Sequence, residues 1–214
     1  NATSTSDRDA TFPNRFISSG TQTLTLGTPP APLAYDWFEL RAGDVLSLSA
    51  TSAPLLGIVA SKVIVQGEIR ADGLVQGGAG PSGAGLGGFQ ANTGSGGGGY
   101  GGAGGDGGYD FGDTQATGGV TYDDPATQSI FPGSSGNGGS PTSFGRGGGA
   151  IVITGLDVLI GAAARLSVNG SAGGLFASSS AGEMCGGGGG SGGGILVNGV
   201  VVSIAGTGEA QGGT

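Results

Sequence analysis

The stretch from Gly94 to Gly112, GSGGGGYGGAGGDGGYDFG, constrains the fold more than any other part of the sequence. Read in steps of three, two of its three registers carry only glycine from residue 96 to residue 108, and the third carries Tyr100, Ala103, Asp106 and Tyr109. A helix with three residues per turn places the three registers on three faces, and polyproline II is such a helix. The repeat therefore predicts polyglycine II helices whose two bare edges let neighbouring backbones approach closely.

Composition decides whether such a chain folds at all. Glycine supplies 54 of the 214 residues, which without a strict G-X-Y period is typical of low-complexity or disordered chains. Order is favoured here because 36% of the residues are hydrophobic, only 10% are charged, and the apolar residues cluster in strand-like runs. The net charge of −8 and the absence of a long apolar run argue against a nucleic-acid partner and against a membrane span.

A unit of strand, glycine turn and strand recurs at residues 61–73, 156–170 and 200–208, and each copy is followed by a glycine-rich stretch. Units that cannot bury their apolar face alone must stack. The recurrence predicts an all-β fold of β-helix or β-solenoid type beside a polyglycine II helix bundle, with almost no α-helix. The matched positions are Val63 with Val158, Val65 with Ile160, and Ile69 with Leu166.

This reading gives a domain plan. Residues 1–33 are expected to form an N-terminal arm, which could lie over its own domain or donate a strand to a neighbouring subunit. Residues 34–214 are expected to form a single glycine-rich β domain. Trp37, within a strand–turn–strand pattern, either caps the core or makes an exposed aromatic contact. The polyglycine II segments are placed near residues 77–119, 133–149 and 182–194.

The motifs GGGGYGGAGGDGG at residues 96–108 and GGGGGSGGG at residues 186–194 carry a resemblance. They resemble the polyglycine II bundles of snow-flea-type antifreeze proteins and of phage tail-tip adhesins. Strand exits such as EIRADG and RLSVNG before glycine runs resemble glycine-rich secreted surface proteins of bacteria. The resemblance covers residues 61–214 and implies a secreted protein, but it carries no particular activity to this chain.

Candidate chemistry is sparse. Asp106, Asp110 and Asp113 lie close enough in sequence to be weak Ca²⁺ ligands, although their spacing matches no known calcium loop and solvated loop acids are the alternative. The chain has no histidine for acid–base catalysis or metal ligation, and no nucleophile elbow precedes a helix. We therefore expect neither an enzyme nor a cofactor.

Four single residues leave alternatives open. Cys185 is the only cysteine, so it is either a buried small residue or one half of a disulfide between subunits. Asn1 and Asn169 begin N-glycosylation sequons, which matter only if the chain is glycosylated. The chain opens without methionine, which fits a processed product, and the sequence does not say whether Thr214 is a natural end.

Two functions remain. The first is a non-catalytic extracellular structural protein, a self-assembling subunit of a surface filament or matrix that associates as a homo-oligomer through the N-terminal arm and the C-terminal strand repeat. That repeat, VVVSIAGTG, has no polar cap, and a head-to-tail interface that does not close produces filaments. The alternative is an adhesin or a module that binds a glycan, a surface or ice through Tyr100, Asp106, Tyr109 or Trp37.

Overall fold

The computed structural model describes residues 13–25, 31–49, 54–79, 85–88, 94–101, 103–107, 115–122, 130–138, 143–177 and 184–214. These residues form strands and extended segments, and no helix occurs among them. The strands are β1 (Arg15–Ile17), β2 (Thr21–Thr25), β3 (Leu33–Leu40), β4 (Val45–Ser49), β5 (Leu55–Val65), β6 (Glu68–Arg70), β7 (Ala150–Ile160), β8 (Arg165–Ser167), β9 (Leu175–Ala177), β10 (Met184–Gly186), β11 (Gly194–Ile204) and β12 (Thr207–Glu209).

The chain forms two compact units, where the sequence led us to expect one domain over residues 34–214. The sheet unit comprises Asn1–Ala71, Ile151–Ser167 and Ile195–Glu209, and the glycine unit comprises Asp72–Ala150, Val168–Gly194 and Ala210–Thr214. Residues 1–12 of the expected arm lie outside the described residues. Its described strands, β1 and β2, belong to the sheet unit's own sheets.

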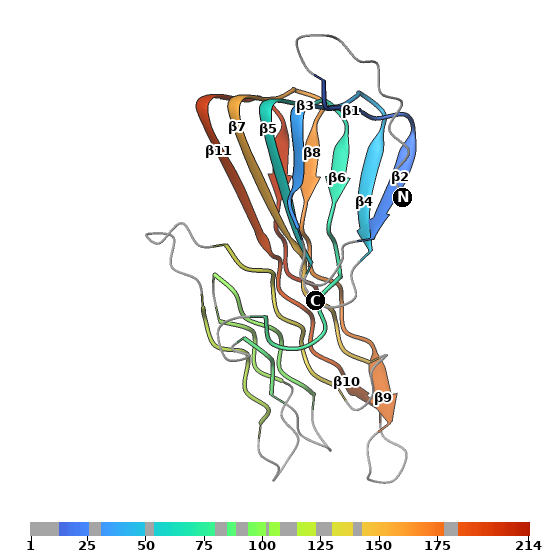
Figure 1. Cartoon of the computed structure of the whole chain (residues 1–214). Helices are drawn as coiled ribbons and strands as arrows, with labels where there is room; N and C mark the ends of the chain where they lie inside the picture. The colour runs from blue at the N-terminus through green and yellow to red at the C-terminus, as the bar shows by residue number, and fades with distance from the viewer. Residues whose placement is uncertain are drawn as a thin grey trace. The chain divides into compact units, whose positions relative to one another are not determined.

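The sheet unit contains two parallel five-stranded sheets (Figure 1). Consecutive strands alternate between them, so one sheet has the order β1-β3-β5-β7-β11 and the other the order β12-β8-β6-β4-β2. The register of the second sheet places Ile69 beside Leu166, as the alignment of the sequence repeats predicted. Each pair of consecutive strands therefore adds one strand to each sheet at the same level.

The core of the sheet unit lies between the two sheets. Buried residues alternate along the strands, with one break in the alternation in the middle of β5 and of β7, and the inner residues at the ends of β3, β5 and β7 are almost completely buried. Burying a branched or aromatic side chain of this size stabilises a fold by roughly 1.5–3 kcal/mol. Examples from the first sheet are Phe38, Val63, Val65, Val158 and Ile160, and from the second Leu46, Ile69 and Leu166.

Glycine shapes the tight corners between the sheets. A Cβ atom on Gly67, between β5 and β6, would lie 2.3 Å from the carbonyl oxygen of Asp44. The matching corner between β11 and β12 holds Gly206, where a Cβ atom would lie 2.6 Å from the carbonyl oxygen of Ala164. Both distances are impossible for a real side chain, so these two corners require glycine.

The predicted β-helix or β-solenoid flanked by polyglycine II helices is wrong as the fold of this chain. The strands instead form two separate, stacked parallel sheets. The alternating pattern of apolar residues identified the strands, but it does not distinguish stacked sheets from a coil.

The glycine unit consists mostly of extended segments joined by backbone hydrogen bonds. In the described part of this unit, β9 and β10 form an antiparallel pair. Elsewhere the donors follow a period of three: the N–H groups of Gly187, Gly190 and Gly193 all bond to the segment 168–174, whereas Gly188 and Ser191 bond to the segment 134–137. A strand in a sheet bonds to two sides in a plane, so a period of three indicates neighbours on several sides.

Candidate interaction surface

The C-terminal strand pair, β11 and β12, ends both sheets of the sheet unit. Among the described residues, each of the two strands has a hydrogen-bonded neighbour on one side only, β7 for β11 and β8 for β12. The strand pair therefore exposes a row of backbone groups that are ready to pair with a further strand.

Matched positions show what this exposure does to the core. The N–H groups of Gln66, Gly161 and Ala205 donate in turn to the carbonyls of Leu40, Val65 and Ile160, which sets one register across β3, β5, β7 and β11. In that register Ile204 occupies the position of Ile160, and Val202 the position of Val158. Ile160 and Val158 are 1% and 0% exposed, whereas Ile204 and Val202 are 59% and 41% exposed.

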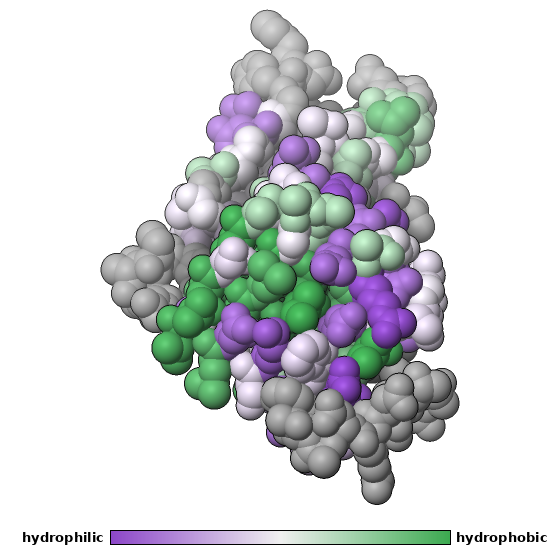
Figure 2. Space-filling view, turned by 90° about the horizontal axis from the view of Figure 1, so that it is seen from above, coloured by the Kyte–Doolittle hydropathy of each residue, from purple (hydrophilic) through white to green (hydrophobic). Residues whose placement is uncertain are grey.

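The edge strand β11 carries none of the usual protection against association. It has eleven residues, GILVNGVVVSI, without lysine, proline or any charge. Val200 and Val201, at 80% and 59% exposure, extend the apolar surface beyond the core positions. Figure 2 shows apolar surface gathered on the left of the view, the side on which Figure 1 draws β11. A long, uncharged, apolar edge strand is a predicted site of strand addition.

An ionic clamp holds the second strand of this pair in place. The Arg165 guanidinium on β8 donates to both carboxylate oxygens of Glu209 on β12, at 2.8 and 2.5 Å, and to Glu68 on β6 at 2.5 Å. Hydrogen bonds from Arg70 and then from Arg165 lower the pKa of Glu68, although partial burial opposes them. Hydrogen bonds to Glu209 and then to Glu68 raise the pKa of Arg165. The contact between Arg165 and Glu209 therefore holds β12 in place against β8.

The N-terminal strand pair, β1 and β2, ends the sheets on the opposite side. A cavity of about 310 Å³ opens there, lined mainly by apolar side chains that include Phe16, Leu24 and Leu46. Gln22 also lines it, and its Oε1 atom is buried without a hydrogen-bond partner among the described residues. This end therefore holds an apolar hollow and an unused acceptor.

Trp37 lies on β3 with charged groups on both sides. Arg15 on β1 and Lys62 on β5 are its neighbours in register, and their charged groups lie 5.2 and 5.4 Å from its ring centroid. Its Nε1–H donates to Glu39 at 3.1 Å, and Lys62 pairs with Asp157 at 3.0 Å. The ring is therefore part of a ladder of cations and acids across the sheet, and its faces are occupied.

Two of the other residues predicted to bind a partner or Ca²⁺ make contacts within the glycine unit. Tyr100 packs edge-on against Tyr122 at 5.3 Å, and the Asp106 carboxylate accepts the N–H of Gly118 at 2.7 Å. Tyr109, Asp110 and Asp113 lie outside the described residues. Among the described residues, no group of three or more acidic, cysteine or histidine side chains is placed to hold a metal ion.

Cys185 and Asn169 are both engaged in the glycine unit. Cys185 lies opposite Phe176 in the β9–β10 pair and is 9% exposed, which favours the interpretation as a buried small residue. The side-chain oxygen of Asn169 accepts the backbone N–H of Gln211 at 2.7 Å, and the backbone N–H of Asn169 donates to the Asp72 carboxylate at 2.6 Å. The amide oxygen of Asn169 thus bonds to the backbone of the final segment.

Sequence reasoning missed the clamp formed by Glu68, Arg165 and Glu209. A signal was present, since the aligned repeats place an acidic residue at position 68 directly beside a basic residue at position 165. Opposite charges at one level of neighbouring strands indicate a cross-strand pair.

Comparison with protein-family models, with curated proteins and with solved structures finds no match. No helix long and apolar enough to cross a membrane occurs among the described residues.

Proposed function

We propose that this chain is a non-catalytic, extracellular structural protein that assembles end to end into a filament or matrix. The exposure of Val202 and Ile204, at positions that are buried in the preceding strand pair, carries the proposal. These two apolar side chains occupy core positions but lack the covering strand pair that Val158 and Ile160 have. A second copy supplies that layer when its N-terminal strand pair continues the sheets.

Both ends of the sheet unit fit this arrangement because they are ends of the same two sheets. Phe16 on β1 occupies the inward position that Phe38 and Val63 take further along, so Phe16 of the next copy would continue the column that ends at Val202. The hollow beside Phe16 can receive apolar side chains of the preceding copy. Such a contact joins two different surfaces and repeats without closing, which produces filaments.

The adhesin alternative receives less support from the contacts. Both faces of Trp37 lie against charged groups, and Tyr100 packs against Tyr122. An aromatic side chain that stacks on a sugar needs a free face.

Analytical ultracentrifugation and electron microscopy of the full chain test the proposal. We expect wild-type protein to form concentration-dependent, open-ended species, and the double variant Val202→Lys with Ile204→Lys to remain monomeric. Leu175→Lys is the matched control, because Leu175 is an equally apolar, 69% exposed residue on β9. Wild-type protein that stays monomeric at every concentration would refute the proposal.

A charge test fixes the register. Val201 occupies the position of Asp157 and would therefore lie beside Arg15 of the next copy. We expect Val201→Asp to assemble like the wild type and Val201→Lys to assemble at least about tenfold more weakly, because like charges at close range repel. Equal weakening by both substitutions would rule out this register.

A further inference from the structure

The segment 187–193 of the glycine unit has one unused side. The hydrogen bonds donated by this segment recur with a period of three, so its N–H groups fall into three sets. One set, Gly187, Gly190 and Gly193, bonds to the segment 168–174, and a second set, Gly188 and Ser191, bonds to the segment 134–137. The third set is Gly189 and Gly192, and their N–H groups have no acceptor among the described residues.

The carbonyl groups of the same segment are used on all three sides. Gly188 and Ser191 accept from the segment 145–148, Gly190 accepts from Gly213, and Gly189 accepts from Gly98. The side with the two unused donors is therefore a gap beside a segment that is hydrogen-bonded to neighbouring segments on its other sides.

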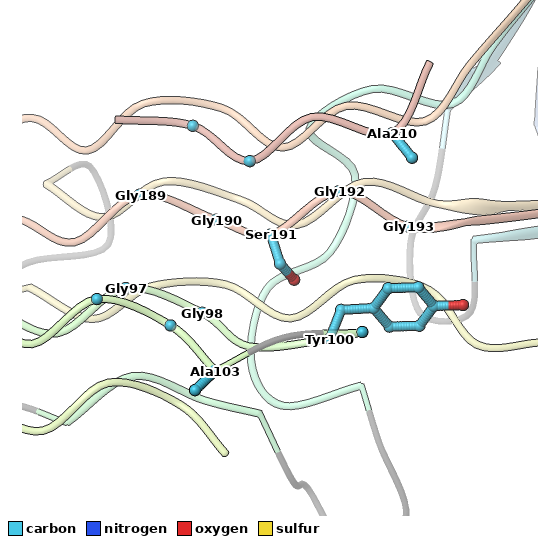
Figure 3. A pocket seen from close by; sticks show the side chains of 15 residues that line it. Gly97, Gly98, Tyr100, Ala103, Gly189, Gly190, Ser191, Gly192, Gly193 and Ala210 are labelled. Atoms are coloured by element: carbon cyan, nitrogen blue, oxygen red, sulfur yellow. The ribbon is translucent and has the colours of Figure 1, made fainter. Parts of the chain in front are cut away.

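A groove of about 480 Å³ lies at this gap. Its lining comes from residues 97–98, 100–101 and 103–105, from residues 189–193, and from Ala210, Gly212 and Gly213 (Figure 3). Gly192 is buried, so its unused N–H group is not simply part of an exposed loop. All of these residues belong to the glycine unit.

The dimensions and chemistry of the groove select one kind of occupant. Two donors three residues apart lie about 9 Å from each other along an extended segment, and they match carbonyls that recur at the same spacing. The other sides of this segment are covered by extended, glycine-rich backbone at distances that leave no room for a Cβ atom. At Gly188, for example, a Cβ atom would lie 2.0 Å from the carbonyl oxygen of Gly96.

We infer that the groove binds an extended, glycine-rich peptide segment of a partner chain, which completes the set of segments around residues 187–193. The bound segment accepts hydrogen bonds from Gly189 and Gly192. This site lies in the glycine unit and does not depend on end-to-end assembly of the sheet unit.

The test uses the full-length protein and a synthetic peptide, GSGGGGYGGAGGDG, which repeats the sequence of residues 94–107. Nuclear magnetic resonance follows the backbone amides during titration. We expect the resonances of Gly189 and Gly192 to shift and their hydrogen exchange to slow by about fivefold or more, as one added hydrogen bond each would produce. A peptide with alanine at every third glycine should have no effect, because its methyl groups prevent close approach.

Two matched variants locate the binding. Gly105→Leu places a side chain at a groove position where a Cβ atom meets nothing within 4 Å, and it should abolish the shifts. Gly186→Leu makes the same change at another open position that does not line the groove, and it should leave them intact. Unchanged glycine amides elsewhere show that both variants fold.

Three results would overturn the inference. The first is an absence of any shift up to the solubility limit of the peptide. The second is binding that survives Gly105→Leu. The third is strong protection of the Gly189 and Gly192 amides in the free monomer, since the chain would then already fill its own groove.

Discussion

The sheet unit and the glycine unit solve the same problem with opposite means. In the sheet unit, stacked side chains such as Phe38 and Val63 exclude water. Each strand pair covers the apolar side chains of the pair before it. In the glycine unit the backbones themselves are in contact, and hydrogen bonds between segments replace side-chain packing. One unit depends on which side chains are present, and the other depends on their absence.

The largest effect is expected when a single methyl group is added to the glycine unit. Gly188→Ala places a Cβ atom 2.0 Å from the Gly96 carbonyl oxygen, against backbone that cannot move away easily. We expect a loss of more than about 4 kcal/mol in the free energy of unfolding of that unit. Chemical denaturation measures the loss. Gly186→Ala, two residues away in open space, is the control and should change little; equal losses would contradict backbone packing.

A second test shortens a buried side chain in the core of the sheet unit. Ile160→Ala should cost about 2–5 kcal/mol because it leaves a cavity in a fully buried layer. Ile204→Ala makes the same change at the matched position of the last strand pair, where 59% of the residue is exposed, and should cost less than about 1 kcal/mol in the monomer. Thermal unfolding of dilute protein compares the two, and similar costs would show that the last layer is already covered.

The smallest effect concerns pH. Hydrogen bonds from Arg70 and Arg165 hold the pKa of folded Glu68 below its ordinary value, so this pairing stabilises the sheet unit above the unfolded pKa and is lost as the pH falls through the folded pKa. Glu68→Gln should therefore lower the melting temperature slightly at pH 7 and by less at pH 3. Melting curves at both values check this, and a difference that persists at low pH would contradict the assignment.

The sequence revealed the elements of the sheet unit better than their arrangement. Alternating apolar residues located β5 and β7, and the match of Ile69 with Leu166 is a pairing in the structure. The alternation could not show that β1 and β2 continue the same sheets, because a period of two says which face is buried and not which strand is adjacent. It also could not separate stacked sheets from a coil, which is where the fold prediction failed.

The candidate site was visible in part. The uncapped repeat VVVSIAGTG pointed to the C-terminal strand pair, because a run of uncharged β-branched residues has no polar residue to face water. The groove of the glycine unit could not be foreseen. Glycine runs do not record which of their sides meet a neighbour, since every register of GGGGGSGGG offers the same backbone.

Backbone packing in the glycine unit also has a calorimetric consequence. Exposure of apolar surface raises the heat capacity on unfolding, whereas exposure of polar surface lowers it. The glycine unit buries mainly peptide groups, so its heat-capacity increment per residue should fall well below the usual value of about 12–15 cal/mol/K. A small increment flattens the stability curve. The glycine unit should therefore resist cooling better than the sheet unit, whose stabilisation weakens as water becomes colder.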